Sequence, residues 1–227
     1  DLQNSAYRYL RNSVPIGMGY VAAYLEEQFA GQISIHTFRK FEEIYESLED
    51  TPPDIIAFGS YTWNTQLSYR TASYLRQRFP EMVITMGGPN VSPNVLSTEL
   101  MANQHRYIDF FMPNEAEAPM RNLVAQVLEG GRSAALESGV DGCLSINPKT
   151  NKLMGAVMDR FDGDINDLPS PYLSGSMDRY LADSSYLPIV QTARGCPYRC
   201  TFCVSGKDTW SKIKAFDTER VKAEINY

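Results

Sequence analysis

The feature that most restricts the fold is a series of short apolar runs separated by segments with helical spacing. The runs are 54–59 (DIIAFG), 82–86 (MVITM) and 109–112 (DFFM). Continuous apolar runs of this length are typical of strands buried on both faces of a parallel sheet. The other elements predicted in this region are a strand at Ile33–Phe38 and helices at Pro15–Phe29, Phe41–Leu48, Thr65–Phe79 (with Asn64 as N-cap), Asn94–Met101 and Ala116–Leu128, the last stopped by Gly130-Gly131. This alternation predicts an α/β domain, a doubly wound parallel sheet with helices on both faces.

The pattern changes after this domain. Two short strands, Cys143–Asn147 and Leu153–Met158, flank a turn-rich stretch and predict a β-hairpin. The Pro-, Gly- and Ser-rich segment 161–176 is expected to be an extended linker, followed by a new strand at Tyr186–Thr192. A helix is expected to begin at Thr218. We therefore predict three regions, with limits 1–135, 136–185 and 186–227.

Composition excludes several classes of partner. The net charge is −6 and the charges are dispersed, which argues against nucleic acid and anionic membranes as partners. No run approaches the ~18 apolar residues of a spanning helix, and no signal-like segment opens the chain. We expect a cytoplasmic protein with neither a nucleic-acid nor a membrane partner.

Three of the four cysteines form a triplet, Cys196, Cys200 and Cys203, with the spacing C-x3-C-x2-C. A structural zinc site usually takes four ligands in two pairs, whereas three thiolates leave one iron of a [4Fe–4S] cluster open for another ligand. A zinc site completed by a later residue, or thiols without a metal, are the alternatives. Cys143 lies far upstream, in the predicted hairpin, and is expected to be a small buried apolar residue.

The segment Cys196–Cys203 (CPYRCTFC), preceded by Thr-Ala-Arg-Gly and a predicted strand, resembles the signature of radical S-adenosylmethionine enzymes. The resemblance implies that the open iron chelates S-adenosylmethionine, that one electron from the cluster cleaves its C–S bond, and that a 5′-deoxyadenosyl radical forms. It also implies that Phe202 lies against the adenine. An external one-electron donor of the flavodoxin or ferredoxin type is then expected as a partner.

Distinctive residues also follow each of the three apolar runs. In open α/β sheets, ligands bind beyond the carboxyl ends of the strands, and glycines or small polar residues there let a large ligand approach the backbone. Taken alone, this pattern fits a ligand site and ordinary turns about equally well. The candidate residues are Ser60, Tyr61, Thr62, Trp63 and Asn64, then Gly87, Gly88, Pro89 and Asn90, and finally Asn114, Glu115 and Glu117.

The combination of this domain with the cysteine triplet resembles the cobalamin-binding radical S-adenosylmethionine enzymes. The matching pieces are 15–25 (PIGMGYVAAYL), the Tyr-Thr-Trp-Asn loop, Gly-Gly-Pro, Asn114–Glu117 and 168–173 (LPSPYL). Many relatives have Gly-Glu-Gly-Glu where this chain has Asn-Glu-Ala-Glu. The resemblance implies a flavodoxin-like cobalamin domain, followed by the start of a partial (β/α)6 barrel.

One motif of some cobalamin proteins, Asp-x-His-x-x-Gly, is absent from the sequence. His36 lies in a predicted strand and His105 precedes another, so both are expected to be packing or surface residues. Any cobalamin is therefore expected to bind without a histidine ligand to cobalt.

The activity that the resemblance implies is methylation of an unactivated carbon in a small-molecule or natural-product substrate. Cyclisation or oxidative rearrangement on the same scaffold is an alternative. Another is a non-catalytic ligand-binding or interaction module that has lost its corrinoid. Most of the barrel would follow Tyr227, so the chain alone is expected to be inactive.

Overall fold

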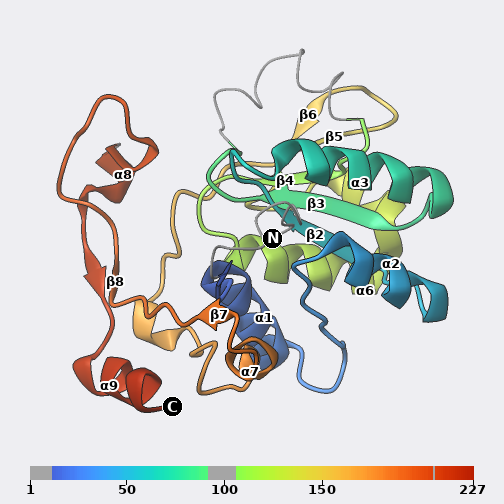
Figure 1. Cartoon of the computed structure of the whole chain (residues 1–227). Coiled ribbons are helices and arrows are strands. Elements are labelled where there is room, and N and C mark those ends of the chain that lie inside the picture. Colours follow the sequence, from blue (N-terminus) through green and yellow to red (C-terminus); the bar gives the residue numbers. More distant parts are fainter. Residues whose placement is uncertain (1–11, 92–105, 207) are drawn as a thin grey trace. The chain divides into compact units, whose positions relative to one another are not determined.

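The computed structural model describes residues 12–91, 106–206 and 208–227, which divide into two compact units (Figure 1). Unit 1 comprises residues 38–159, and unit 2 combines residues 12–37 with 160–227. The division places the first helix in unit 2 and the hairpin in unit 1. This division into units differs from the three predicted regions 1–135, 136–185 and 186–227. The limits of those regions remain a prediction.

The centre of unit 1 is a parallel sheet of three strands in the order β2-β3-β4. These strands are β2 (Ile55–Gly59), β3 (Val83–Gly87) and β4 (Phe110–Met112). They pair in register, so that Gly59 lies opposite Gly87 and Gly87 lies opposite Met112. The three apolar runs are thus the parallel strands that the sequence predicted, and their carboxyl ends reach one edge of the sheet.

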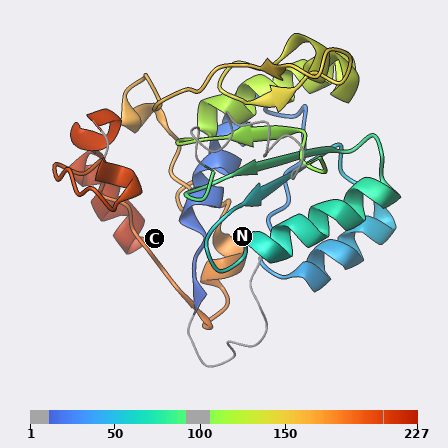
Figure 2. The ribbon, with the colours of Figure 1, turned by 90° about the horizontal axis from the view of Figure 1, so that it is seen from above.

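Helices cover both faces of this sheet. In Figure 2, α2 (Phe41–Asp50) and α3 (Thr65–Arg78) lie on one face, and α6 (Glu117–Ser138) lies on the other. The chain of α6 leaves helical geometry at Gly131, where the sequence predicted a stop. The structure confirms the predicted α/β class with a parallel sheet. The buried side chains between the sheet and α2 and α3 include Ile44, Leu48, Phe58, Ala72, Leu75, Ile84 and Met86.

The predicted hairpin is formed by β5 (Ser145–Ile146) and β6 (Leu153–Met154), which are antiparallel and shorter than expected. Just before β5, Leu144 and Phe111 exchange two main-chain hydrogen bonds of 2.8 Å each. A single isolated bridge therefore joins the segment before the hairpin to β4.

Unit 2 contains α1 (Ile16–Gln28) and a two-residue parallel pairing of β1 (Asn12–Ser13) with β7 (Tyr186–Leu187). Its other elements are a 3-10 helix at Ile165–Asp167, α7 (Asp178–Leu181) and α9 (Thr218–Asn226), the last as predicted. Two small cores hold it together. They comprise Tyr20, Tyr24, Ile165, Leu168 and Phe216, and Val14, Tyr172, Met177 and Tyr180.

Three expectations about residues 33–38 and 161–192 fail, and for the first of them the reason is tertiary packing, which a local pattern does not show. The segment 161–176 is no extended linker, because Ile165, Leu168 and Tyr172 are buried. Residues 33–38 form no strand. The strand predicted at 186–192 is limited to β7, so the described elements do not include a barrel start. The helix predicted at 94–101 lies outside the described residues.

The last strands of unit 2 are β8 (Ala193–Arg194) and β9 (Lys214–Ala215), which pair antiparallel. Between them the chain forms the cysteine loop, with a 3-10 turn at Val204–Gly206 and a one-turn helix, α8 (Asp208–Ser211).

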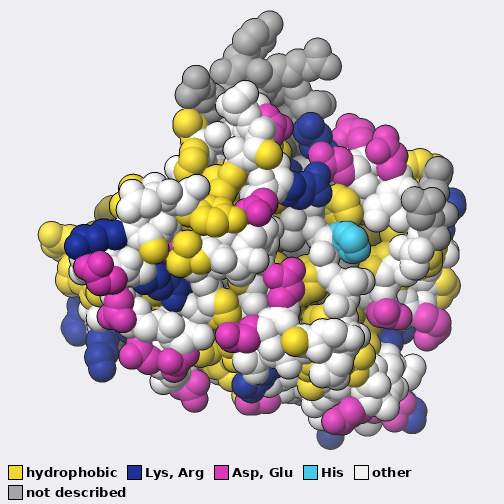
Figure 3. Space-filling model, turned by 90° about the horizontal axis from the view of Figure 1, so that it is seen from below, with side chains coloured by type: hydrophobic (Ala, Val, Ile, Leu, Met, Phe, Trp, Pro, Cys, Tyr) yellow, Lys and Arg dark blue, Asp and Glu magenta, His cyan; other side chains and the backbone are white. Residues whose placement is uncertain are grey.

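On the molecular face in Figure 3, acidic and basic side chains are interspersed with uncharged ones. Among the described residues, no helix has the length and apolar character needed to cross a bilayer.

A buried carboxylate ties the amino-terminal edge of the sheet to both helical layers. Asp109, 7% exposed, accepts hydrogen bonds from Arg76 of α3 at 2.5 Å and from Arg132 of α6 at 2.7 Å. Its Oδ2 also accepts from the main-chain N–H of Ile84 at 2.9 Å. Removing the charge leaves two guanidinium groups without their shared anion.

We predict that Asp109→Asn lowers the free energy of unfolding by about 3 kcal/mol, because one partner of a buried ion pair is lost. Urea unfolding measures the change. Glu137→Gln is the control, because its ion pair with Lys149 is exposed at 40% and 69%, and its expected effect is below ~1 kcal/mol. Equal effects of the two substitutions would contradict a structural role for the Asp109 cluster.

Candidate cofactor sites at the strand ends and the cysteine loop

The loop after β2 is shaped by Asn64. Its Oδ1 accepts from the Tyr61 N–H at 2.7 Å, and its Nδ2 donates to the Gly59 carbonyl at 2.9 Å. Asn64 stands at the N-cap position of α3 as predicted, but its side chain makes no capping hydrogen bond to the helix. The buried amide instead closes residues 59–64 into a fixed turn at the end of the strand.

Hydroxyl groups connect this loop to the loop after β3. Thr65 Oγ1 lies 2.6 Å from the Tyr61 carbonyl oxygen and 3.1 Å from Ser60 Oγ, and it accepts from Asn90 Nδ2 at 2.8 Å. Sequence reasoning did not include Thr65 among the site residues. Its place in the first turn of a helix that follows a parallel strand was the available signal, since such turns face the ligand edge.

Gly88 allows the two loops to approach. Its φ is +97°, and a Cβ there would lie 2.9 Å from the carbonyl oxygen and 3.0 Å from the nitrogen of Ser60. The Ser60 N–H donates to the Gly87 carbonyl at 2.7 Å, and the Asn90 N–H donates to the Ser60 carbonyl at 3.2 Å. Of the two predicted glycines, Gly88 is therefore the one whose missing side chain this contact requires.

An aromatic pair stands beyond β2. The rings of Tyr61 and Trp63 stack with centroids 4.8 Å apart and planes 12° apart, and Trp63 is 70% exposed. Burial raises the pKa of the Tyr61 hydroxyl, and the charge of Arg39 opposes this rise. Arg39 is itself buried at 5% exposure, and nothing in its sequence context indicated this. Thr62 and Pro89 are exposed.

The loop after β4 reads Asn-Glu-Ala-Glu, without the glycines of the Gly-Glu-Gly-Glu motif described above. Asn114 has a left-handed backbone with φ +66°, a conformation that asparagine tolerates better than most residues. Its Nδ2 donates to the Met158 carbonyl at 3.2 Å. Ala116 has φ −104°, which needs no glycine. Neither position therefore requires a glycine in this chain, and Glu115 and Glu117 follow with Glu117 buried.

The structure brings all three strand-end loops to one edge of the unit 1 sheet, because the strands end in register. Contacts join the first two loops, as described above. The third is adjacent, since a Cβ on Gly87 would lie 3.3 Å from the Met112 carbonyl oxygen and 4.0 Å from Ala116 Cβ. An edge of this kind offers fixed main-chain groups, hydroxyl and amide side chains and an exposed aromatic surface to one large ligand.

The cysteine loop lies in unit 2 as a separate candidate site. Cys196 is half-buried, Cys200 and Cys203 are exposed, and all three are free thiols. The Cys203 N–H donates to the Cys200 carbonyl at 3.1 Å, which closes a turn. In the described part of the chain, no three His, Cys, Asp or Glu side chains are grouped as metal ligands, so the thiols are not gathered at one point. Phe202, next to the last cysteine, is 91% exposed.

Cys143 and His36 lie outside both sites. Cys143 is fully buried, its Sγ–H donates to the Pro119 carbonyl at 3.6 Å, and burial raises the pKa of its thiol. It is the packing residue that the sequence predicted. His36 is exposed in an irregular segment and not in a strand (histidine is cyan in Figure 3). His105 lies outside the described residues.

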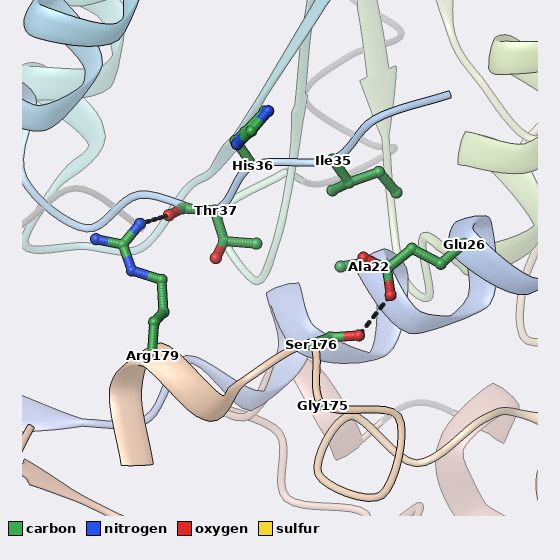
Figure 4. A pocket seen from close by; sticks show the side chains of 8 residues that line it. All are labelled: Ala22, Glu26, Ile35, His36, Thr37, Gly175, Ser176 and Arg179. Atoms are coloured by element: carbon green, nitrogen blue, oxygen red, sulfur yellow. Dashed lines mark hydrogen bonds between the residues drawn. The ribbon is translucent and has the colours of Figure 1, made fainter. Parts of the chain in front are cut away.

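Unit 2 also has a pocket of about 280 Å³, which none of the predicted site residues lines (Figure 4). Glu26 Oε2 accepts from Ser176 Oγ at 2.7 Å, and Arg179 Nη1 donates to the Thr37 carbonyl at 2.6 Å. Both charged side chains are thus bonded to protein atoms. The other lining residues are Ala22, Ile35, His36 and Gly175.

A parallel α/β unit of this kind belongs to the class of proteins that bind ligands beyond the carboxyl ends of their strands. The chain belongs to the B12 binding domain family, which it matches over residues 10–124.

Two curated relatives and one solved structure are similar. The chain is 32% identical, over 182 residues, to the 2-(S-pantetheinyl)-carbapenam-3-carboxylate methyltransferase of Streptantibioticus cattleyicolor, covering 78% of this chain and 26% of the relative. It is 31% identical, over 180 residues, to the cobalamin-dependent radical SAM methyltransferase TokK of Streptomyces tokunonensis, covering 77% and 25%. The chain therefore spans about a quarter of the length of these relatives.

The solved structure is the cobalamin-dependent S-adenosylmethionine radical enzyme OxsB with aqua-cobalamin and S-adenosylmethionine bound. The TM-score is 0.72 at 17% identity, covering 99% of this chain and 30% of that one. This likeness shows the fold.

We predict that iodoacetamide at pH 8 alkylates Cys196, Cys200 and Cys203 in the metal-free native protein but leaves Cys143 unmodified. The thiolate is the reactive form, and burial both excludes the reagent and keeps the Cys143 thiol protonated. Mass spectrometry of the digested protein measures the labels, and unfolding in urea should expose all four. Native labelling of Cys143 would show that it is accessible.

Proposed function

We propose that the chain is the cofactor-binding part of a cobalamin-dependent radical S-adenosylmethionine enzyme, which methylates an unactivated carbon of a small molecule or natural product. The observation that carries the proposal is that one chain joins a B12 binding domain to a loop with three free, accessible thiols. The relatives named above support the reaction class. We place the domain limits at 1–135 and 186–227, with the hairpin and the following segment between them.

The strand-end edge of unit 1 fits a corrinoid. The missing side chain of Gly88 leaves main-chain groups close together, and the exposed Trp63 ring on Tyr61 offers a flat apolar surface to a planar ring system. The network around Ser60, Thr65 and Asn90 supplies hydrogen-bonding groups for the polar side chains of the corrin or for the nucleotide tail. We assign the cobalamin site to the three strand-end loops.

The cysteine loop fits an iron–sulfur cluster in the number and kind of its donors. Cys200 and Cys203 are exposed and Cys196 is half-buried, so an incoming cluster can reach all three and draw them together. Cys143 is fully buried in the core of unit 1, where it cannot serve as a fourth ligand without unfolding. A cluster held by these three thiols would leave one iron for S-adenosylmethionine, and we propose that the exposed Phe202 ring contacts its adenine.

When bound, the cluster supplies the electron that cleaves S-adenosylmethionine, and cobalamin carries the methyl group. The chain's own part is to hold both cofactors on fixed main-chain frames. We further propose a flavodoxin- or ferredoxin-type electron donor and a cytoplasmic location.

For cobalamin, we predict that Trp63→Ala weakens binding about tenfold through loss of the aromatic contact. Gly88→Val should abolish binding, because its side chain would collide with Ser60. The measurement is corrinoid absorbance retained after hydroxocobalamin is added and the protein desalted. Leu128→Ala is the control, because it removes another exposed apolar side chain of unit 1. A wild-type protein that retains no corrinoid would favour a non-catalytic interaction module.

For the cluster, we predict that anaerobic reconstitution with iron and sulfide gives a brown protein, and that Cys200→Ala abolishes the colour. Cys143→Ala is the matched control and should reconstitute normally, because this thiol is buried away from the loop. Metal analysis and the visible spectrum measure the result. Zinc in place of iron and sulfide in the wild-type protein would rule the cluster out.

A further inference from the structure

The neck of the cysteine loop is where its two ends meet; we define it as residues 194–196 and 210–214. The β8–β9 ladder pairs Arg194 with Lys214. Beyond the ladder, the Cys196 N–H donates to the Trp210 carbonyl at 2.8 Å. The first cysteine of the triplet is therefore held by a main-chain bond across the neck.

The two sides of the neck are in direct main-chain contact at Gly195. This residue has φ +110°, and a Cβ there would lie 2.6 Å from the Lys212 carbonyl oxygen and 2.9 Å from that of Trp210. Two carbonyl oxygens therefore face Gly195 at the point where the loop closes. A cationic donor bound to a carbonyl oxygen at this point makes a charge-assisted hydrogen bond, which is stronger than a neutral one.

Arg160 supplies such a donor to both sides. Its Nη1 donates to the Lys212 carbonyl at 2.5 Å, and its Nη2 donates to the Arg194 carbonyl at 3.3 Å. Its guanidinium carbon lies 5.0 Å from the ring centroid of Trp210, the residue whose carbonyl holds Cys196. A planar guanidinium can bond two carbonyls and stack on a ring at once, whereas an ammonium cannot.

The segment directly after Arg160 is itself bonded to Lys214 of the β8–β9 ladder. Lys214 Nζ donates to the carbonyls of Phe161 and Gly163, the latter at 3.2 Å. The hydrogen bonds therefore run in both directions, from Arg160 to the neck and from the neck to residues 161–163. The main chain directly after Arg160 and the Arg160 side chain are both bonded, which limits the entropy cost of the Arg160 hydrogen bonds.

We propose that Arg160 is a positioning residue that keeps the neck closed and so fixes Cys196 for cluster binding. It acts through the main chain and touches none of the three thiols in any described contact. The effect on the cluster rests on the proposed function, whereas the effect on the neck of the metal-free protein does not.

The test compares two variants. Arg160→Met removes the N–H donors but keeps an apolar side chain, and Arg160→Lys keeps the positive charge but loses the planar guanidinium that bonds two carbonyls. Trypsin cleavage after Arg199 in the metal-free protein, followed by mass spectrometry, measures opening of the loop. We expect cleavage about tenfold faster for Arg160→Met, since a bridging charged group is lost, and an intermediate rate for Arg160→Lys. If Arg160→Met does not fold, as judged by circular dichroism, Arg160→Lys decides the outcome.

Arg179→Met is the matched control. Arg179 also donates to one carbonyl, that of Thr37, and its guanidinium carbon lies 5.1 Å from the ring centroid of Tyr180, but it makes no described contact with the neck. Its cleavage rate after Arg199 should equal that of the wild type. A wild-type rate for both Arg160 variants, or an equal increase in the Arg179→Met protein, would overturn the proposal.

The reconstituted protein gives a second readout that a general loss of stability does not mimic. We expect Arg160→Met to lose iron to a chelator faster than wild type. After one-electron reduction of the cluster with dithionite, we expect it to show an altered electron paramagnetic resonance line shape, with partial rescue of both effects in Arg160→Lys. Unchanged iron loss and line shape would overturn the role in cluster binding. If wild type binds no iron and sulfide while Arg160→Met still opens faster, the proposed function fails and the role in the neck stands.

Discussion

The candidate cobalamin site depends on one constraint, which is that β2, β3 and β4 pair in parallel and in register. Because Gly59, Gly87 and Met112 stand side by side, the residues that follow each strand emerge at one edge of the sheet. The bonds between the first two loops then fix their shape, and Gly88 sets how closely they approach. An open edge built in this way is rigid before any ligand arrives, which lowers the entropy cost of binding.

The cysteine loop is organised on a different principle. Its support is a ladder of two residue pairs, and most of the side chains that the structure describes in it are exposed. Such a loop has little apolar burial of its own, so its conformation depends on main-chain bonds across the neck and on the Arg160 guanidinium. The two proposed cofactors are thus held by opposite means, one by a packed sheet and the other by a loop closed at its base.

Sequence patterns named the residues of both candidate sites but did not show how these residues are bonded to one another. The apolar runs predicted all three strands. Burial on both faces is the reason for β3 and β4, whereas β2 is only partly buried and its Ala57 is exposed. Asn64 was expected to cap α3, whereas its amide closes the β2 loop; the same side chain can bond to either partner, and local sequence does not distinguish them. Arg39 and Arg160 escaped notice because their contacts are with residues that a sequence pattern does not bring together. Thr65 was missed although its place in the first turn of α3 was an available signal.

The sequence alone determined the α/β class, the order of strands and helices in unit 1, the cysteine triplet and the buried role of Cys143. These follow from composition, spacing and period, which are local properties. Only the tertiary structure decided that residues 161–168 form part of a core, that the first helix joins the C-terminal unit, and that Arg160 spans the neck. Each of these depends on contacts between distant segments, whose energies arise only when the chain has folded.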